Sequence, residues 1–180
     1  MTKLRHYDDL DTARFITFSC HRRMHLLKDD RLKMTFIDHL KLSRERSRFR
    51  LLGFVIMPNH VHLVILPAQK SAVGRIIGEL KSRSARDLVN ILRTSDAHLL
   101  ERISVERNGR HKYAFWQRRC FDHNCRNEAT TIEKVEYCHN NPVRSGLVDD
   151  PEKWRWSSYA SYAGHDDAVI EIDELVSELI

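Results

Sequence analysis

Two histidines stand one residue apart inside an apolar run. Residues 57–65 read MPNHVHLVI, and the imidazoles are those of His60 and His62. Successive side chains of a β-strand point to opposite faces, so a strand would place both imidazoles on one face and Val61 on the other. Two imidazoles so placed can share one divalent cation. The alternative is a half-exposed strand with two polar residues on its wet face, and the pair alone does not decide between these.

A tyrosine and an asparagine four residues apart are the second chemical pair. NEATTIEKVEYCHNN (127–141) predicts a helix, which would place Tyr137 and Asn141 on one face. A tyrosine hydroxyl can act as a nucleophile, and an amide oxygen can ligate a hard cation. Alternatively, Tyr137 is a core aromatic and Asn141 caps the helix before Pro142. The chain has neither a helical HExxH motif, typical of zinc proteases, nor a Gly-rich phosphate loop.

The elements that must position these residues follow from hydrophobic periodicity. Strands are predicted at 13–20, 50–57, 60–67 and 112–117, with a tight turn at Pro58-Asn59. Helices are predicted at 28–49, 71–92 and 127–141, the last ended by Pro142. Residues 93–110 and 142–163 are predicted loops, and the last dozen residues form a short helix or strand.

The order of these elements predicts an α+β fold. The first six match the split βαβ, or ferredoxin-like, plan, an antiparallel four-stranded sheet with two helices on one face. The third helix then carries Tyr137. A length of 180 residues suits one domain with a proper core, and no linker divides the chain.

Charge is divided unevenly along the chain. The net charge is +5, but residues from Asp149 onward hold nine acidic and two basic side chains. The body before them is therefore strongly basic, which favours a nucleic-acid partner over a membrane surface, the alternative being a solubilising surface. No apolar stretch of about 18 residues predicts a transmembrane helix, and the N-terminus lacks a signal-peptide core. We therefore expect a cytosolic protein that does not bind membranes.

The four cysteines do not predict a disulfide framework, because none forms a CxxC pair. A zinc site from Cys120, Cys125 and His123 can be drawn, but its spacing matches no common zinc knuckle. Reduced thiols are the favoured interpretation.

Several motifs in fixed order carry a family resemblance. They are GFVIMPNHVHLVILP (53–67), IIGELKSRSARDLVN (76–90), FWQRRCFDHNCRNE (115–128), YCHNNPVRSGLV (137–148) and WRWSSY (154–159). The chain resembles the HUH single-tyrosine transposases, and within them the REP-associated tyrosine transposases. The resemblance spans roughly residues 13–163, so we expect a transposase domain over 1–163 and an acidic C-terminal extension over 164–180.

This resemblance implies a site and a substrate. His60, His62 and Asn141 would bind Mg²⁺ or Mn²⁺, and Tyr137 would attack a DNA phosphodiester to give a 5′-phosphotyrosine intermediate. The implied fold is ferredoxin-like, and the implied partner is hairpin-forming single-stranded DNA, bound by a monomer or a homodimer. One departure is Arg119-Cys120, where the family often has Gly-Tyr before the shared FDH.

Basic and aromatic residues supply candidate DNA contacts. Phosphate contacts give affinity rather than sequence choice, whereas aromatic rings can stack on unpaired bases. The candidates for phosphate are Lys81, Arg83, Arg86, Arg118 and Arg119; those for bases are Tyr113, Trp116, Phe121 and Trp154. For each cation the alternative is a solvated surface charge, and Trp116 and Phe121 could equally belong to the core.

Three functions remain open. The first is an active DNA-nicking and strand-transferring enzyme, which the presence of all four chemical residues favours. The second is an inactive or domesticated relative that binds hairpin nucleic acid without cleaving it. The third is a metal-dependent phosphodiesterase that uses water, with Tyr137 only structural.

Overall fold

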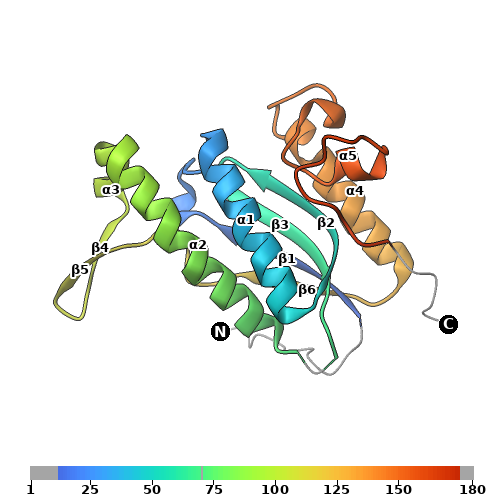
Figure 1. Ribbon diagram of the computed structural model, residues 1–180, viewed down its shortest axis with the longest axis horizontal. Helices are drawn as coiled ribbons and strands as arrows, with labels where there is room; N and C mark the ends of the chain where they lie inside the picture. Colours follow the sequence, from blue (N-terminus) through green and yellow to red (C-terminus); the bar gives the residue numbers. More distant parts are fainter. Residues whose placement is uncertain (1–11, 70, 175–180) are drawn as a thin grey trace.

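A four-stranded antiparallel sheet organises the protein (Figure 1). The computed structural model describes residues 12–69 and 71–174. The strand order is β2-β3-β1-β6, which is the ferredoxin-like order and confirms the predicted α+β fold. The sheet and its main helices comprise β1 (Ala13–Ser19), α1 (Asp30–Ser47), β2 (Arg50–Met57), β3 (His60–Leu66), α2 (Val73–Ser95), β6 (Phe121–Cys125) and α4 (Glu128–Arg144).

Side-chain alternation divides the sheet into two buried faces. On one face Ile16 and Phe18 of β1 join the larger core, which α1 and α2 complete. On the other face Ala13 and Phe15 join a smaller core that includes Val135 of α4. Figure 1 shows α1 and α2 together on one side of the sheet and α4 apart from them. Each strand therefore presents every second residue to α4.

Strand register places the two histidines on the α4 face. His62 of β3 lies opposite Thr17 of β1, and His60 lies opposite Ser19. Val61, between them, belongs to the larger core on the other face. The prediction that 60–67 is a strand with both imidazoles on one side is confirmed.

The predicted fourth strand was wrong. Residues 112–117 do not join the sheet as a strand, because Arg110–Tyr113 forms β5, which pairs with β4 (Ser104–Arg107) in a separate hairpin. Phe115 and Trp116 are buried in the larger core, so their apolar pattern reflects packing beneath the helices. The fourth strand is β6, which sequence periodicity missed because Phe121 and His123 are exposed.

Two further predictions need correction. The region 93–110, expected to be a loop, contains the end of α2, the helix α3 (Ala97–Arg102) and β4. The third helix does not end before Pro142 but continues to Arg144. Proline in the last turn removes a single intrahelical hydrogen bond, and Ser145 N still donates to Asn141 O at 3.0 Å.

The chain after α4 fastens that helix to β2. It contains η2 (Pro151–Lys153) and α5 (Tyr159–Tyr162). Ser158 Oγ accepts a hydrogen bond from Phe54 N at 3.0 Å and lies 2.9 Å from His139 Nε2 on α4. Tyr162 donates to Leu52 O at 2.8 Å. The 142–163 segment, expected to be a loop, thus includes short helical turns with a clear packing role.

The described part of the C-terminal extension packs on the domain. Val169 and Ile170 are buried in the larger core, and the Asp173 carboxylate accepts a hydrogen bond from Leu51 N and pairs with Arg44. Residues 168–174 form neither helix nor strand, and 175–180 lie outside the described residues. The boundary at residue 163 stays a prediction. No described helix is long and apolar enough to cross a bilayer.

Gly53 sets how closely α4 approaches the sheet, which gives a test. A Cβ at Gly53 would lie 3.0 Å from Val135 Cγ2, and a β-branched residue in a helix has little rotamer freedom to move away. We expect Gly53→Ala to lower the free energy of unfolding by about 1 kcal/mol and Gly53→Val by about 1–3 kcal/mol. Thermal or urea unfolding measures both values.

Gly78→Ala is the matched control, because a Cβ there meets nothing within 4 Å. It lies inside α2, so we expect it to stabilise the fold by about 0.5–1 kcal/mol. A Gly53→Ala variant as stable as Gly78→Ala would show that α4 is not held at close contact.

Candidate active site

Two imidazole nitrogens point at each other on the α4 face of the sheet. His60 Nε2 and His62 Nε2 are 3.0 Å apart. Asn59 Oδ1, which can only accept, lies 2.6 Å from His60 Nδ1, so that nitrogen carries the proton. His62 Nδ1 lies 2.7 Å from Thr17 Oγ1, and the Asn141 amide lies 3.3 Å from His62 Nε2. Both Nε2 atoms therefore face one point.

Burial keeps both rings neutral. It lowers the pKa of His60 to about 4, with a further contribution from the positive charge of Arg23. It lowers the pKa of His62 to about 3, with a further contribution from His60. At neutral pH each ring is uncharged and keeps one nitrogen lone pair, and neutral histidine is the form that binds metals.

The geometry fits a divalent ion. Two neighbouring ligands of an octahedral ion with bonds of about 2.1 Å lie about 3.0 Å apart, which matches the separation of the two Nε2 atoms. Asn141 is buried, and its Oδ1 has no hydrogen-bond partner among the described residues. A 180° turn of this amide would direct the oxygen toward the two Nε2 atoms. An ion there would give Asn141 Oδ1 a partner and replace the contact between the two Nε2 atoms with two metal–nitrogen bonds.

Tyr137 stands beside this cluster on the same helix as Asn141. Its ring lies 5.4 Å from the His62 ring and 5.7 Å from the Phe15 ring, edge-on to both. The Arg144 guanidinium lies 5.0 Å from the centre of the Tyr137 ring. The side chain is half-buried, and its hydroxyl makes no hydrogen bond with any described residue. The structure thus brings together all four residues singled out from the sequence.

The supports of the site were missed at the sequence level. Phe15 stacks on His62, with ring centres 5.2 Å apart and planes 18° from parallel. Thr17 fixes the ring through Nδ1, as the outer partners of metal-binding histidines do. His139 holds α4 through Ser158, and burial lowers its pKa to about 4. The available signal was the polar Thr17 amid the apolar residues of β1 and the two serines of WSSY.

The alternative metal sites do not form. Within 12–69 and 71–174 no group of three or more His, Cys, Asp or Glu side chains could hold an ion. This excludes the zinc site drawn from Cys120, Cys125 and His123 at the sequence level. The four cysteines are free thiols. The candidate metal ligands are therefore two imidazoles and one amide, with oxygen atoms of substrate and water left to complete the shell of a hard cation.

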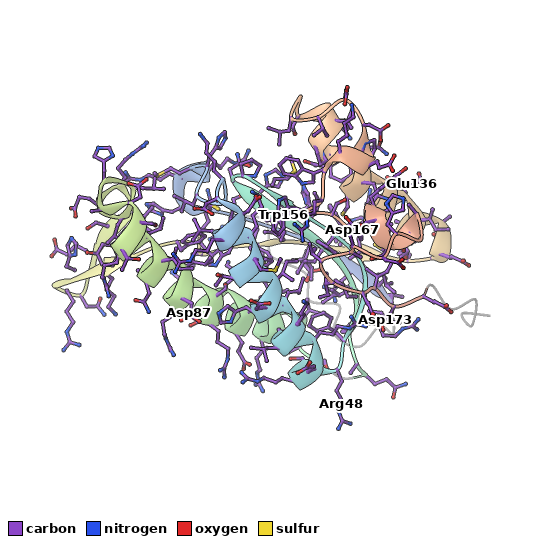
Figure 2. All side chains as sticks on the ribbon, turned by 45° about the horizontal axis from the view of Figure 1, so that its top comes forward. Arg48, Asp87, Glu136, Trp156, Asp167 and Asp173 are labelled. Carbon is purple, nitrogen blue, oxygen red and sulfur yellow. The ribbon has the colours of Figure 1, made fainter. Side chains whose placement is uncertain are left out.

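The predicted phosphate contacts lie in two places. Arg83 and Arg86 line a cavity of about 210 Å³ together with Arg46 and Asp87, between α1 and α2 and away from α4. Figure 2 shows Asp87 and Glu136 of α4 on different sides of the molecule. Arg118 and Arg119 are exposed just before β6. Their roles stay predictions.

Lys81 is internal rather than exposed. Its ammonium donates to Arg118 O at 3.1 Å and lies 5.8 Å from the centre of the Phe18 ring. Burial lowers the pKa of Lys81. These contacts tie α2 to the segment just before β6. Lys81 could contact DNA only if its side chain left them.

Comparison with known proteins shows the family of this chain. The family model "Transposase IS200 like" matches residues 12–141. The chain belongs to the IS200-like transposases. A Haemophilus influenzae protein named "Putative REP-associated tyrosine transposase" is 26% identical over 142 residues, covering 74% of this chain and 76% of the relative.

A solved structure shares the fold of this transposase. A REP-associated tyrosine transposase bound to a REP hairpin superposes with a TM-score of 0.70 at 18% identity, covering 98% of this chain and 100% of the other. At such low identity the match shows a shared fold and says nothing of individual side-chain contacts. Membership of a transposase family implies DNA cleavage and strand transfer in general terms.

The Thr17–His62 hydrogen bond gives a test of the metal site. Thr17→Val removes the partner of His62 Nδ1 at nearly constant volume, so the ring is free to rotate and to exchange tautomers. We expect the affinity for Mn²⁺ to fall about 10- to 100-fold, measured by titration calorimetry. Thr17→Ser keeps the hydroxyl and should bind Mn²⁺ as the wild type does. Equal affinities for the valine and serine variants would contradict this role.

Proposed function

We propose that this transposase nicks and rejoins hairpin-forming single-stranded DNA through a covalent bond to Tyr137, with His60, His62 and Asn141 holding Mg²⁺ or Mn²⁺. The observation that carries the proposal is the convergence of both Nε2 atoms and Asn141 beside the Tyr137 ring. The supporting chemistry is that of a tyrosine nucleophile at a metal-bound phosphodiester.

The reaction balances without an external energy source. Tyr137 Oη forms a bond to phosphorus and loses its proton to solvent. The bond from phosphorus to O3′ breaks, and O3′ takes up a proton and leaves as a hydroxyl. The 5′-phosphotyrosine keeps one phosphodiester bond for each one broken, so attack by another 3′-hydroxyl rejoins strands without ATP. When bound, the divalent ion would supply Lewis-acid stabilisation of the charge that develops on the phosphate.

The residues of the site each have a task in this scheme. Phe15 and the edge-on contact with His62 hold the Tyr137 ring toward the two imidazoles. Arg144, over the Tyr137 ring, adds positive charge where an anionic strand must enter. Asn141 sits one helical turn further along α4, so the nucleophile and one ligand move as a unit.

Hairpin DNA is the proposed substrate. The structural relative was solved with a REP hairpin, and the two chains share their fold over nearly their whole lengths. Before Asp149 this chain carries a strong excess of positive charge, which suits a polyanion. Phosphate contacts by Arg118 and Arg119 are part of the proposal, as are contacts by Arg83 and Arg86 to a more distant part of the strand.

Tyr137→Phe tests the nucleophile. Wild-type protein incubated with a hairpin-bearing single strand and Mn²⁺ should give a covalent adduct on a denaturing gel, because the phosphotyrosine bond survives denaturation. Tyr137→Phe lacks the attacking oxygen, so we expect at least a 1,000-fold loss, on the order of the loss when a catalytic nucleophile is removed. Tyr113→Phe, on the β5 hairpin, is the control and should retain the adduct. Cleavage that survives in Tyr137→Phe would refute the tyrosine mechanism.

His60→Ala tests the metal ligands. Removing one Nε2 lone pair should abolish Mn²⁺-dependent cleavage while hairpin binding, measured by fluorescence anisotropy, changes less than about threefold, since contacts with phosphates elsewhere supply most of the affinity. His98→Ala changes an exposed histidine of α3 and should cleave normally. Joint loss of folding and binding in His60→Ala would mean that the histidine pair is structural.

A further inference from the structure

The edge strand β6 presents two aromatic rings on the same sheet face as the active site. Phe121 lies opposite Thr17 and His123 lies opposite Phe15 in the antiparallel pairing with β1. Residues directly opposite each other project to the same face, and Thr17 in turn lies opposite His62. Phe121, Thr17 and His62 therefore form one row across three strands, with about 10 Å between the backbone positions of Phe121 and His62.

Phe121 is the most exposed large apolar residue among those described, with 58% of its surface accessible. The ring of His123, also exposed, is within 4° of parallel to it, with the ring centres 6.3 Å apart. Helix α4 covers Cys125 at the far end of β6 and leaves these two rings open. The sheet face thus changes from buried core to an open aromatic surface next to the catalytic groups.

The backbone beneath these rings is firmly anchored. Asp122 projects to the opposite face, where its carboxylate pairs with Arg14, a residue with 0% exposure. Arg14 Nε donates to Asp122 Oδ1 at 3.0 Å. Thr12 also donates to Asn124 near the end of the strand. The exposed rings therefore stand on a rigid strand, which reduces the entropy that a ligand would lose on binding.

Cationic side chains lie before and after the two rings along the chain. Arg118 and Arg119 precede β6 and Arg126 follows it, and all three are exposed. On α4, Lys134 pairs with Glu133 and lies 6.0 Å from the ring of Phe15, the residue opposite His123 in the strand register. Aromatic faces among cations are the combination by which proteins bind single-stranded nucleic acid, because bases stack on the rings while phosphates meet the charges.

We propose that Phe121 and His123 form a stacking subsite for an unpaired base next to the scissile phosphate. The subsite takes a nucleobase of single-stranded DNA, holds it by its π face and so selects for an unpaired strand rather than for a particular base. This subsite adds to the proposed function, and its location beside the scissile phosphate rests on that function. A base in a duplex cannot reach it, since its faces are covered by its neighbours.

Binding of an abasic series tests this subsite. The probe is a hairpin oligonucleotide with single-stranded thymidine flanks, bound to Tyr137→Phe protein with Mn²⁺ and measured by anisotropy. Phe121→Ala in this background should weaken binding about 5- to 100-fold. An abasic site at the stacked position should weaken binding to the parent by a similar factor and leave Phe121→Ala unaffected. Phe121→Leu should behave like the alanine variant, and Phe121→Trp should bind like the parent.

Ile132→Ala is the matched control. Ile132 is 39% exposed on α4 and lines a pocket with His139, Tyr159 and Tyr162, none of which the proposal assigns to DNA, so its loss should not alter binding. Three results would overturn the subsite. The first is unchanged binding in Phe121→Ala, and the second is binding by Phe121→Leu as tight as that of the parent. The third is that the loss from Phe121→Ala and the loss from an abasic site add up at every abasic position. These readouts need no cleavage, so an absent Tyr137 adduct would refute the proposed function and leave the stacking result to be judged separately.

Discussion

Two imidazole nitrogens that face each other in a largely buried place are the constraint around which this protein is arranged. His60 Nε2 and His62 Nε2 lie 3.0 Å apart, and burial disfavours the charged form of either ring. Asn59 contacts Nδ1 of His60 and Thr17 contacts Nδ1 of His62, so both imidazoles are held in this orientation. The fold thus retains an arrangement that a cation would stabilise, which is how preorganised metal sites are built.

One face of the sheet supplies most of the stability, and the other carries the candidate active site. The face under α1 and α2 is a continuous apolar core that supplies most of the buried area and so most of the stability. The α4 face has a smaller core, with His60, His62 and Thr17 next to it. Burying such polar groups lowers stability unless they form hydrogen bonds. The stability of the larger core offsets this cost, so the α4 face can carry the candidate catalytic residues. Ser158 and the close approach at Gly53 keep α4 seated over this less apolar surface.

Most of the fold could be predicted from apolar and β-branched runs, because β1, β2 and β3 are buried on both faces of the sheet. Periodicity failed at residues that are buried without belonging to a strand, and at residues that belong to a strand and are exposed. Phe115 and Trp116 look like strand residues because they fill the larger core, and Trp116 Nε1 even donates to Ser84 there. β6 looks irregular because its outer residues are exposed while its polar Asp122 is tied to Arg14. Whether these segments form strands depends on which other strand they pair with, and a single sequence does not reveal that partner.

The sequence by itself determined which residues could do chemistry. The HVH spacing dictates one sheet face for both histidines, and the interval of four dictates one helix face for Tyr137 and Asn141, because both follow from backbone geometry alone. Only the tertiary structure decided that these faces meet, which ring nitrogens face each other, and that Thr17 and Phe15 support them. It also decided that Phe121 is open while Trp116 is core. Such outcomes depend on which strands pair and which helix covers them, and these are long-range contacts that no local pattern contains.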